Sequence, residues 1–346
     1  MRHDAQTTEM QERRLARLAK EIGWIRRETA ERLAATRRIF GRRVCATAIH
    51  THSTHSDGTD PVAANYAAAM QAGLDFMFAT DHFSLKQKRN VRTMPRASWG
   101  QEPGAGGHHI GLLHGRRLFR PRKQDFARNF QTARQLAPFV WVPHPVGWYP
   151  SQWYADDRIA QLWTLGDAFA MEVINGANKV FQAFDAFDAK AVAVWDRLLC
   201  DGKRVTALGA SDAHIAEDVG MAWTGVYAAR CAAPAILRAL NAGECFASES
   251  SLLEFECNRR PMGAAVRRKS GAALRLRFRA ADAAGIESAR LVGAGRVLRE
   301  LNGKNQPLLA GDFSLRPGRR TGYLRFETTA ADGRRAFSSP VYLLPA

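Results

Sequence analysis

Histidine and aspartate side chains are concentrated in short motifs that directly follow runs of apolar residues. The ten histidines of the chain all lie before residue 215. Four motifs stand out, with the sequences His-Thr-His at 50–52, Thr-Asp-His at 80–82, Pro-His-Pro at 143–145 and Ser-Asp-Ala-His at 211–214. Side chains alternate along an extended segment, so both imidazoles of the first motif point to one side and can bind one metal ion. Imidazole mixed with carboxylate, without thiolate, favours Zn, Mn or Fe.

These motifs lie far apart in the sequence, so the fold must bring them together. Short β-type runs alternate with helical stretches over residues 44–250. This alternation predicts a parallel sheet, for which a closed α/β barrel is the commonest large form. The carboxyl ends of barrel strands share one rim, where the four motifs would meet. Because so many ligands exceed what one ion needs, we expect two or three divalent metal ions that activate a water molecule for hydrolysis.

The elements that position the motifs are predicted from apolar runs and from residues typical of helix ends. Strands are expected at 44–49, 76–80, 139–142, 170–174, 205–208 and 224–227, and helices at 123–137, 156–165, 185–201 and 233–242. A further helix is expected to begin with Asp60 as N-cap and Pro61 in its first turn, and to end at Gly73.

Three parts of the chain differ in pattern. Residues 1–43 are basic and place apolar side chains at spacings of three and four, which predicts an amphipathic helical extension. Residues 44–250 hold the expected metallohydrolase barrel. Residues 251–346 alternate polar and apolar positions, which predicts a small β-sandwich-like domain of antiparallel strands. The extension, whose apolar positions are Leu15, Leu18, Ile22 and Ile25, could pack on the barrel or pair two chains as a homodimer.

Composition limits the class of protein. The 346 residues carry a net charge of +17, with basic excess in residues 1–43, 86–128 and 259–346, and each block suits either a solvated face or an anion-binding surface. No apolar run approaches the roughly 20 residues of a membrane span, so we expect no membrane partner. Six acidic residues before position 44 argue against a targeting peptide, which predicts a cytoplasmic location. The five cysteines lack a CxxC pair and are expected to be small buried residues.

Several segments resemble the PHP (polymerase and histidinol phosphatase) superfamily. The segments that carry this resemblance are 50–58, 72–82, 142–145 and 209–214. Further segments, 171–176, 195–202 and 339–342, are similar to the carbaryl-hydrolase-like branch of metallohydrolases. The resemblance covers about residues 44–346 and implies a distorted seven-stranded (β/α) PHP barrel. It also implies a hydrolase that uses two or three divalent metal ions.

The same resemblance implies a ligand set. One ion would take His50, His52, Glu102 and Asp212, a second would share Glu102 and add His109 and His144, and a third would take Asp57, His82 and His214. All of these except His109 are also the expected catalytic residues.

Other residues of the motifs have weaker expected roles. His108 competes with His109 as a ligand, and His55 is expected at the rim of the site. Asp81 and Ser211 are expected to orient ligand imidazoles. Glu172, like Asn175, is expected to line the substrate side of the pocket.

A basic loop follows His82 directly and bears on the substrate. Its residues Lys86, Lys88, Arg89 and Arg92, together with Asn175, are the expected substrate-binding residues. Phosphate oxygens accept paired hydrogen bonds from arginine, so the loop favours an anionic substrate. The predicted function is hydrolysis of a small anionic phosphoester through a metal-activated water. The alternatives are a nuclease acting on DNA or RNA ends, a carbamate-ester hydrolase, and a metal-stabilised binding module without catalysis.

Overall fold

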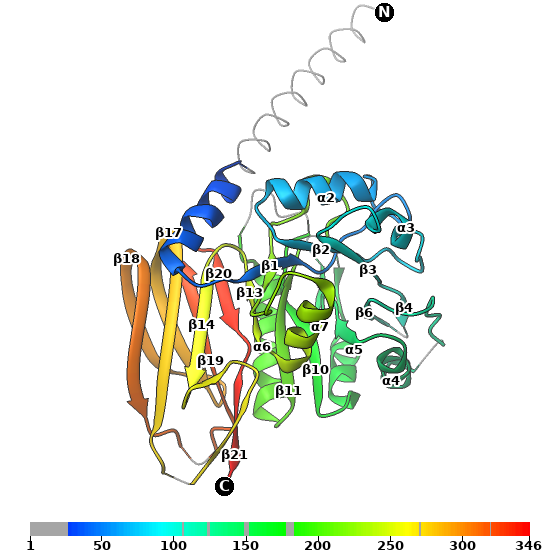
Figure 1. The fold of residues 1–346 in the computed structure, drawn as a ribbon. Coiled ribbons are helices and arrows are strands. Elements are labelled where there is room, and N and C mark those ends of the chain that lie inside the picture. Colours follow the sequence, from blue (N-terminus) through cyan, green and yellow to red (C-terminus); the bar gives the residue numbers. More distant parts are fainter. Residues whose placement is uncertain are drawn as a thin grey trace, which may run out of the picture.

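The computed structural model describes residues 27–105, 107–122, 125–148, 152–177, 183–269, 271–318 and 320–346. An α/β part, which carries the histidine motifs, lies beside a β-rich part (Figure 1). The predicted mixed α/β class, with a large central sheet, is confirmed. The seven-stranded form of the barrel and the division into three domains stay predictions.

Eight strands of the α/β part follow one another through hydrogen-bonded pairs. In spatial order they are β12 (Trp223–Val226), β1 (Cys45–Ala48), β2 (Phe76–Ala79), β3 (Ala97–Gln101), β6 (Gly111–Leu113), β7 (Phe139–Val142), β10 (Ala168–Asn175) and β11 (Arg204–Ala210). The hydroxyl of Thr224 in β12 bonds to the backbone of Gly209 in β11, which brings the two ends of the series together. All six expected strands therefore form.

The series is not wholly parallel, contrary to the prediction. The pairs β3–β6, β6–β7 and β1–β12 are antiparallel, while β1–β2, β2–β3, β7–β10 and β10–β11 are parallel. The connection from Gln101 to Gly111 is too short for the crossover helix that a parallel pair usually needs. It holds instead a small hairpin of β4 (Gly104–Ala105) and β5 (His108–His109).

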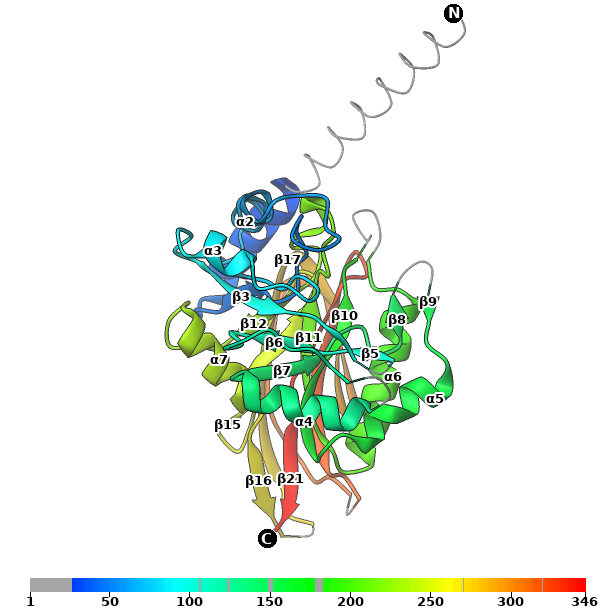
Figure 2. The ribbon, with the colours of Figure 1, turned by 90° about the vertical axis from the view of Figure 1, so that its right-hand side faces the viewer.

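Helices lie around these strands (Figure 2). They are α2 (Val62–Gln71), α3 (Gln87–Val91), α4 (Phe126–Leu136), α5 (Asp156–Ala160), α6 (Ala186–Cys200) and α7 (Ala233–Ala242), with 3-10 turns η1 (Gln161–Thr164) and η2 (Ala216–Asp218). Gly73 and Gly243 end their helices as expected, both with positive φ. Asp60 is not the N-cap of α2, because Pro61 takes that position and the Asp60 carboxylate accepts a bond from the Ala216 backbone instead.

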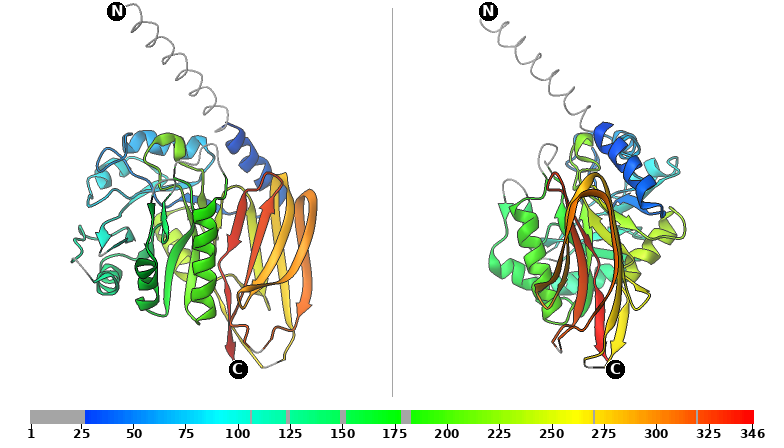
Figure 3. Two further views of the ribbon diagram at one scale, coloured as in Figure 1. Left: turned by 180° about the vertical axis from the view of Figure 1, so that it is seen from behind. Right: turned by 90° about the vertical axis from the view of Figure 1, so that its left-hand side faces the viewer.

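The β-rich part contains β14 (Leu252–Cys257), β15 (Arg260–Pro261), β16 (Ala265–Arg268), β17 (Leu274–Gly293), β18 (Arg296–Leu315), β19 (Tyr323–Ala330), β20 (Arg335–Ser338) and β21 (Val341–Pro345). Its pairs are antiparallel except β16–β21. The first half of β17 alternates buried and exposed side chains, as its sequence predicted. Strand β13 (Cys245–Ser248) pairs with both β12 and β20, so the two parts share a continuous sheet (Figure 3).

The described end of the N-terminal extension, residues 27–40, is a helix that packs on the body of the protein. Arg32 bonds to Asp282 at 2.7 Å and Asp332 at 2.6 Å in the β-rich part. Arg37 bonds to Asp75 of the α/β part at 2.5 Å. This helix therefore ties the two parts together. The apolar positions on which a homodimer was predicted lie outside the described residues, so pairing stays a prediction.

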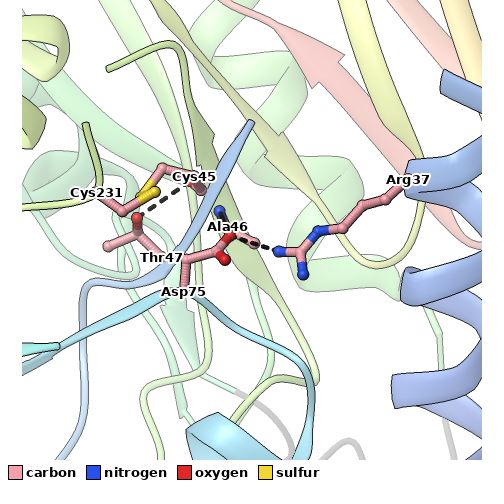
Figure 4. Close-up of a disulfide and its surroundings, with 6 residues drawn as sticks. All are labelled: Arg37, Cys45, Ala46, Thr47, Asp75 and Cys231. Atoms are coloured by element: carbon pink, nitrogen blue, oxygen red, sulfur yellow. Dashed lines mark hydrogen bonds and ion pairs between the residues drawn. A yellow bond between two sulfur atoms is a disulfide. The ribbon is translucent and has the colours of Figure 1, made fainter. Parts of the chain in front are cut away.

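Two of the five cysteines, which were expected only as small buried residues, are joined by a disulfide. Cys45 at the start of β1 and Cys231 ahead of α7 form a disulfide across 186 residues of sequence (Figure 4). Spacing could not reveal this pair, because only the fold places the segment before α7 beside β1. Cys245 and Cys257 are buried as expected, whereas Cys200 is exposed.

Within the described ranges, none of the helices has the length and apolar character required to cross a bilayer.

Candidate metal centre

The candidate ligands lie where strands end, as the barrel interpretation required. His50 and His52 follow β1, His82 follows β2 and Glu102 follows β3. His144 and Asp212 follow β7 and β11, and both have positive φ, at 26° and 48°. Such backbone is costly for residues other than glycine and is concentrated at functional sites. The strained backbone at His144 and Asp212 therefore supports a functional role for these two side chains.

The first predicted group comes together as one buried cluster. The Nε2 atoms of His50 and His52 lie 3.0 Å apart. Each lies 3.0–3.2 Å from Glu102 Oε2 and from Asp212 Oδ1. Two imidazole nitrogens and two carboxylate oxygens therefore face a common point.

The second predicted group shares Glu102 through its other oxygen. Glu102 Oε1 lies 3.0 Å from His109 Nδ1 and 2.9 Å from His144 Nε2. The competitor His108 is turned away, since its Nε2 donates to the Arg158 carbonyl at 2.5 Å. Burial lowers the pKa of His108 to about 4, which suits this neutral, inward role. The geometry therefore separates the two adjacent histidines in favour of His109.

The third predicted group centres on Asp57. Its Oδ2 lies 3.5 Å from His82 Nε2 and 3.3 Å from His214 Nε2. The Nδ1 atoms of these histidines bond to the carbonyls of Glu102 and Asp212, which leaves both Nε2 atoms free to face Asp57. His52 Nδ1 also approaches, at 3.6 Å from Asp57 Oδ1, so this group contains a residue that the prediction placed only in the first.

The donor set fits divalent metal ions on two observations. Among the described side chains, His52 Nδ1 is buried without a hydrogen-bond partner. Glu102 Oε2 also makes no hydrogen bond, although the Nε2 atoms of His50 and His52 lie 3.0 and 3.1 Å from it. Leaving such atoms unsatisfied is costly unless something else binds them. Burial would raise the pKa of Glu102, but His50 and His109 hold it well below its usual range. Charged carboxylate and imidazole without thiolate match Zn, Mn or Fe.

A buried glutamate behind the ligands was misjudged from the sequence. Glu172, expected on the substrate side, is 1% exposed. Its Oε1 accepts bonds from His50 Nδ1 and Trp141 Nε1, both at 2.9 Å, and its Oε2 accepts from the His144 backbone. Proton donation from His50 Nδ1 leaves its Nε2 lone pair free for a ligand role. The one signal in the sequence was an acidic residue inside an otherwise apolar strand.

Three other expectations concern residues around the ligands. Asn175 Nδ2 donates to Glu172 Oε2 at 3.0 Å and Asp212 Oδ2 at 3.2 Å. It holds these carboxylates, and its contact with substrate stays a prediction. Asp81 and Ser211 do not orient imidazoles: Asp81 accepts from Ser53 and Ser56 in the turn after His52, and Ser211 bonds to backbone near η2.

The predicted basic residues share one surface hollow beside the site. Lys86, Lys88, Arg89 and Arg92 line it together with His55. His55 Nε2 lies 2.8 Å from Asn90 Oδ1, and Lys88 Nζ lies 4.4 Å from the Trp99 ring centroid. None of the four cations has an ion pair with a candidate ligand in the described part of the chain, so their contact with substrate stays a prediction.

Aromatic residues form one side of the second group, which sequence reasoning missed. Trp148, in the hairpin of β8 (Gly147–Trp148) and β9 (Gln152–Trp153), lies 5.2 Å from the His144 ring and 6.1 Å from the His109 ring between centroids. Tyr154 Oη lies 3.2 Å from His144 Nδ1. Nothing in the local pattern connected this hairpin with the histidines, because the contact depends on the fold.

Comparison with known proteins gives a short family match. Residues 199–245, from the end of α6 to the start of β13, match the PHP-associated family model, which confirms the resemblance to the PHP superfamily. No match with a curated protein is found. The carbaryl-hydrolase-like branch stays a prediction.

Two solved structures are similar to this chain. One is a two-domain protein from Bacteroides vulgatus named for a predicted PHP-like metal-dependent phosphoesterase, with 18% identity, TM-score 0.49, and coverage of 87% of this chain and 95% of that chain. The other is a protein from Bifidobacterium adolescentis provisionally named a metal-dependent phosphoesterase, with 14% identity, TM-score 0.32, and coverage of 49% and 87%.

Proposed function

We propose that this PHP-superfamily chain is a metal-dependent hydrolase and that its substrate is a small anionic phosphoester. The observation that carries the proposal is the position of Glu102. One of its oxygens faces His50 and His52, and the other faces His109 and His144. A buried carboxylate with imidazoles on both oxygens suits a bridge between two metal ions.

Different side chains would hold the different ions of such a centre. His50, His52, Glu102 and Asp212 would hold one ion, Glu102 with His109 and His144 a second, and Asp57 with His82 and His214 a third. When bound, these ions would lower the pKa of a water molecule and stabilise the charge that develops during hydrolysis. Glu172 fixes the proton of His50 on Nδ1, and the His82 and His214 bonds to backbone carbonyls do the same for those rings.

The choice of an anionic substrate rests on charge beside the site. The basic hollow adjoins the turn that leads from His52 to Asp57 through His55. Arginine and lysine there would attract a phosphate group and hold its oxygens. A contact of this kind lowers the Michaelis constant more than it changes the chemical step.

A hydrolysis panel tests this assignment. We expect metal-loaded protein to hydrolyse a phosphomonoester or a small phosphodiester, with modest loss of rate at 200 mM salt because few cations contact so small an ester. The double variant Arg89→Ala with Arg92→Ala should raise the Michaelis constant for the phosphoester several-fold. Arg128→Ala, an exposed arginine of α4, is the matched control and should leave it unchanged.

A neutral carbamate ester is the second candidate, favoured by Trp148 and Tyr154 beside His144. An aromatic leaving group could stack there without needing the basic hollow. Turnover of the carbamate ester with none of any phosphoester would move the assignment to that activity. Degradation of DNA or RNA that weakens tenfold or more between about 50 and 200 mM salt would favour the nuclease instead.

A further inference from the structure

A separate cavity lies at the opposite end of the strands from the metal centre. It has a volume of about 370 Å³. Phe139, Ala168 and Arg204, the first residues of β7, β10 and β11, line it. The same three strands end at the metal centre, so each runs from the cavity to candidate ligands or their supports. The cavity is therefore a different site from the one described above.

Two arginines at this cavity lack acidic partners. Arg134 of α4 bonds through Nη1 to the Ala168 carbonyl at 3.3 Å, and Ala168 pairs in register with Arg204 across the β10–β11 ladder. Arg134 therefore lies beside the start of β10, and Arg204 is at the start of the neighbouring β11. Both exposed side chains line the cavity. Within the described ranges, no carboxylate forms an ion pair with either guanidinium. An oxyanion could accept hydrogen bonds from both.

A buried phenol points to a ligand independently of the arginines. Tyr342 of β21 is 8% exposed and lines the cavity. Its backbone N–H donates to the Ala264 carbonyl. Among the described residues its hydroxyl has no side-chain or backbone partner, and it is not one of the fully buried polar atoms, so it is accessible from the cavity. Burial raises the pKa of Tyr342 while the nearby Arg204 opposes that shift, so the hydroxyl keeps its proton and stays a donor. This hydroxyl can therefore donate a hydrogen bond to a ligand in the cavity.

Phenylalanine side chains form part of the remaining wall, beside the polar side chains of Thr206 and Asn241. Phe130, Phe139 and Phe169 line it and are 1%, 4% and 7% exposed. A volume near 370 Å³ falls in the lower range of small-molecule sites. A compact ring attached to the anionic group could reach the edges of these phenylalanines while the polar side chains contact the anion.

We propose that this cavity is a second ligand site, which binds a small organic anion. Arg134 and Arg204 hold the phosphate, phosphonate or carboxylate group, Tyr342 donates a hydrogen bond to it, and the phenylalanine rings contact its apolar body. The site lies outside the hydrolytic centre and does not depend on the substrate proposed there.

Equilibrium dialysis of the metal-loaded full chain against phenylphosphonate tests the proposal, because this anion has an aromatic body and no ester to hydrolyse. The metal centre also attracts anions, so bound equivalents per chain are compared between variants. We expect the double variant Arg134→Gln with Arg204→Gln to lose one equivalent, and Tyr342→Phe to weaken that same binding about fivefold. Arg128→Gln with Arg238→Gln, exposed arginines of α4 and α7, is the charge-matched control and should lose nothing.

Four comparisons can overturn the proposal. If the Arg134→Gln and Arg204→Gln protein keeps every equivalent while its circular dichroism and melting temperature match wild type, the cavity is not an anion site. Equal binding of neutral benzyl alcohol, sensitive to Tyr342→Phe but not to the arginines, would also exclude an anion site. Equal affinity for inorganic phosphate and phenylphosphonate would show that the phenyl group makes no contribution, which contradicts the proposed contact with an apolar body. Replacing phenylphosphonate by benzoate shows which oxyanion the site prefers, and failure of both to bind there contradicts the proposal.

Discussion

Glu172 Oε1 lies 2.9 Å from His50 Nδ1, and both side chains are buried. This contact determines which nitrogen of His50 carries the proton and therefore directs the Nε2 lone pair toward His52 and Asp212. The same carboxylate reaches the backbone of His144. One side chain thus aligns residues from two of the three candidate metal groups.

Glu172→Gln should weaken metal binding without unfolding the protein. The amide keeps the size of the side chain but loses the negative charge that strengthens the hydrogen bond from His50 Nδ1. Changes of this kind typically cost about 10–100-fold in metal affinity. Isothermal titration calorimetry with the metal ion measures the change in affinity. Glu300→Gln, on exposed β18, is the control and should titrate like wild type. Unchanged affinity in Glu172→Gln would show that Glu172 does not position His50.

His50→Ala and His55→Ala should have different effects on hydrolysis, because His50 belongs to the buried ligand group and His55 lies at the rim. His50 is completely buried among candidate ligands, whereas His55 bonds to Asn90 at the basic hollow. We expect His50→Ala to abolish hydrolysis and His55→Ala to change the rate by no more than about fivefold, since removing one hydrogen bond typically costs about 1 kcal/mol. Steady-state kinetics at equal melting temperature would decide this. Equal damage from both substitutions would contradict the assigned ligand register.

The strands and most ligands could be predicted because both depend on local pattern. Apolar runs placed β1, β2 and β7 within two residues, and the motifs at their ends supplied the histidines. Long-range relations could not be predicted in this way. Glu172, Trp148 and the Cys45–Cys231 pair acquire their partners only when distant strands pack together. The antiparallel direction of β6 was not predicted, because it depends on how the short connection from β3 folds back.

Cys231→Ser should destabilise the oxidised protein by about 2–4 kcal/mol, the usual contribution of a disulfide. The bond joins β1 to the segment before α7, so its loss frees a long loop in the unfolded chain. Urea denaturation with and without reductant measures the difference, and reductant should bring wild type close to the variant. Cys200→Ser, the exposed free cysteine, is the control. If the stability of the wild-type protein is the same with and without reductant, the disulfide does not form in solution.

Asp332 should make stability sensitive to acid below about pH 4. Partial burial would raise its pKa, but the hydrogen bond from Arg32 outweighs this and the pKa falls to about 2. Because the folded pKa lies below the unfolded value of about 3.9, the stabilisation is complete above that value. It is lost as the pH falls toward 2.

The Asp332→Asn variant isolates this contribution. The variant should be less stable than wild type at pH 7, and the gap should narrow between pH 4 and pH 2. Urea midpoints at several pH values provide the test. A gap that is constant across this window would mean that the Arg32 contact does not depress the pKa of Asp332.

The most direct test of the account is the number of metal ions that the centre binds. Elemental analysis of protein loaded with Mn or Zn and then freed of excess metal should give at least two ions per chain. Chelation should abolish hydrolysis, and Glu102→Gln should lose more than one ion, since each of its oxygens faces a different ligand group. Fewer than one ion per wild-type chain, or hydrolysis that survives complete removal of metal, would contradict a metal-dependent hydrolase.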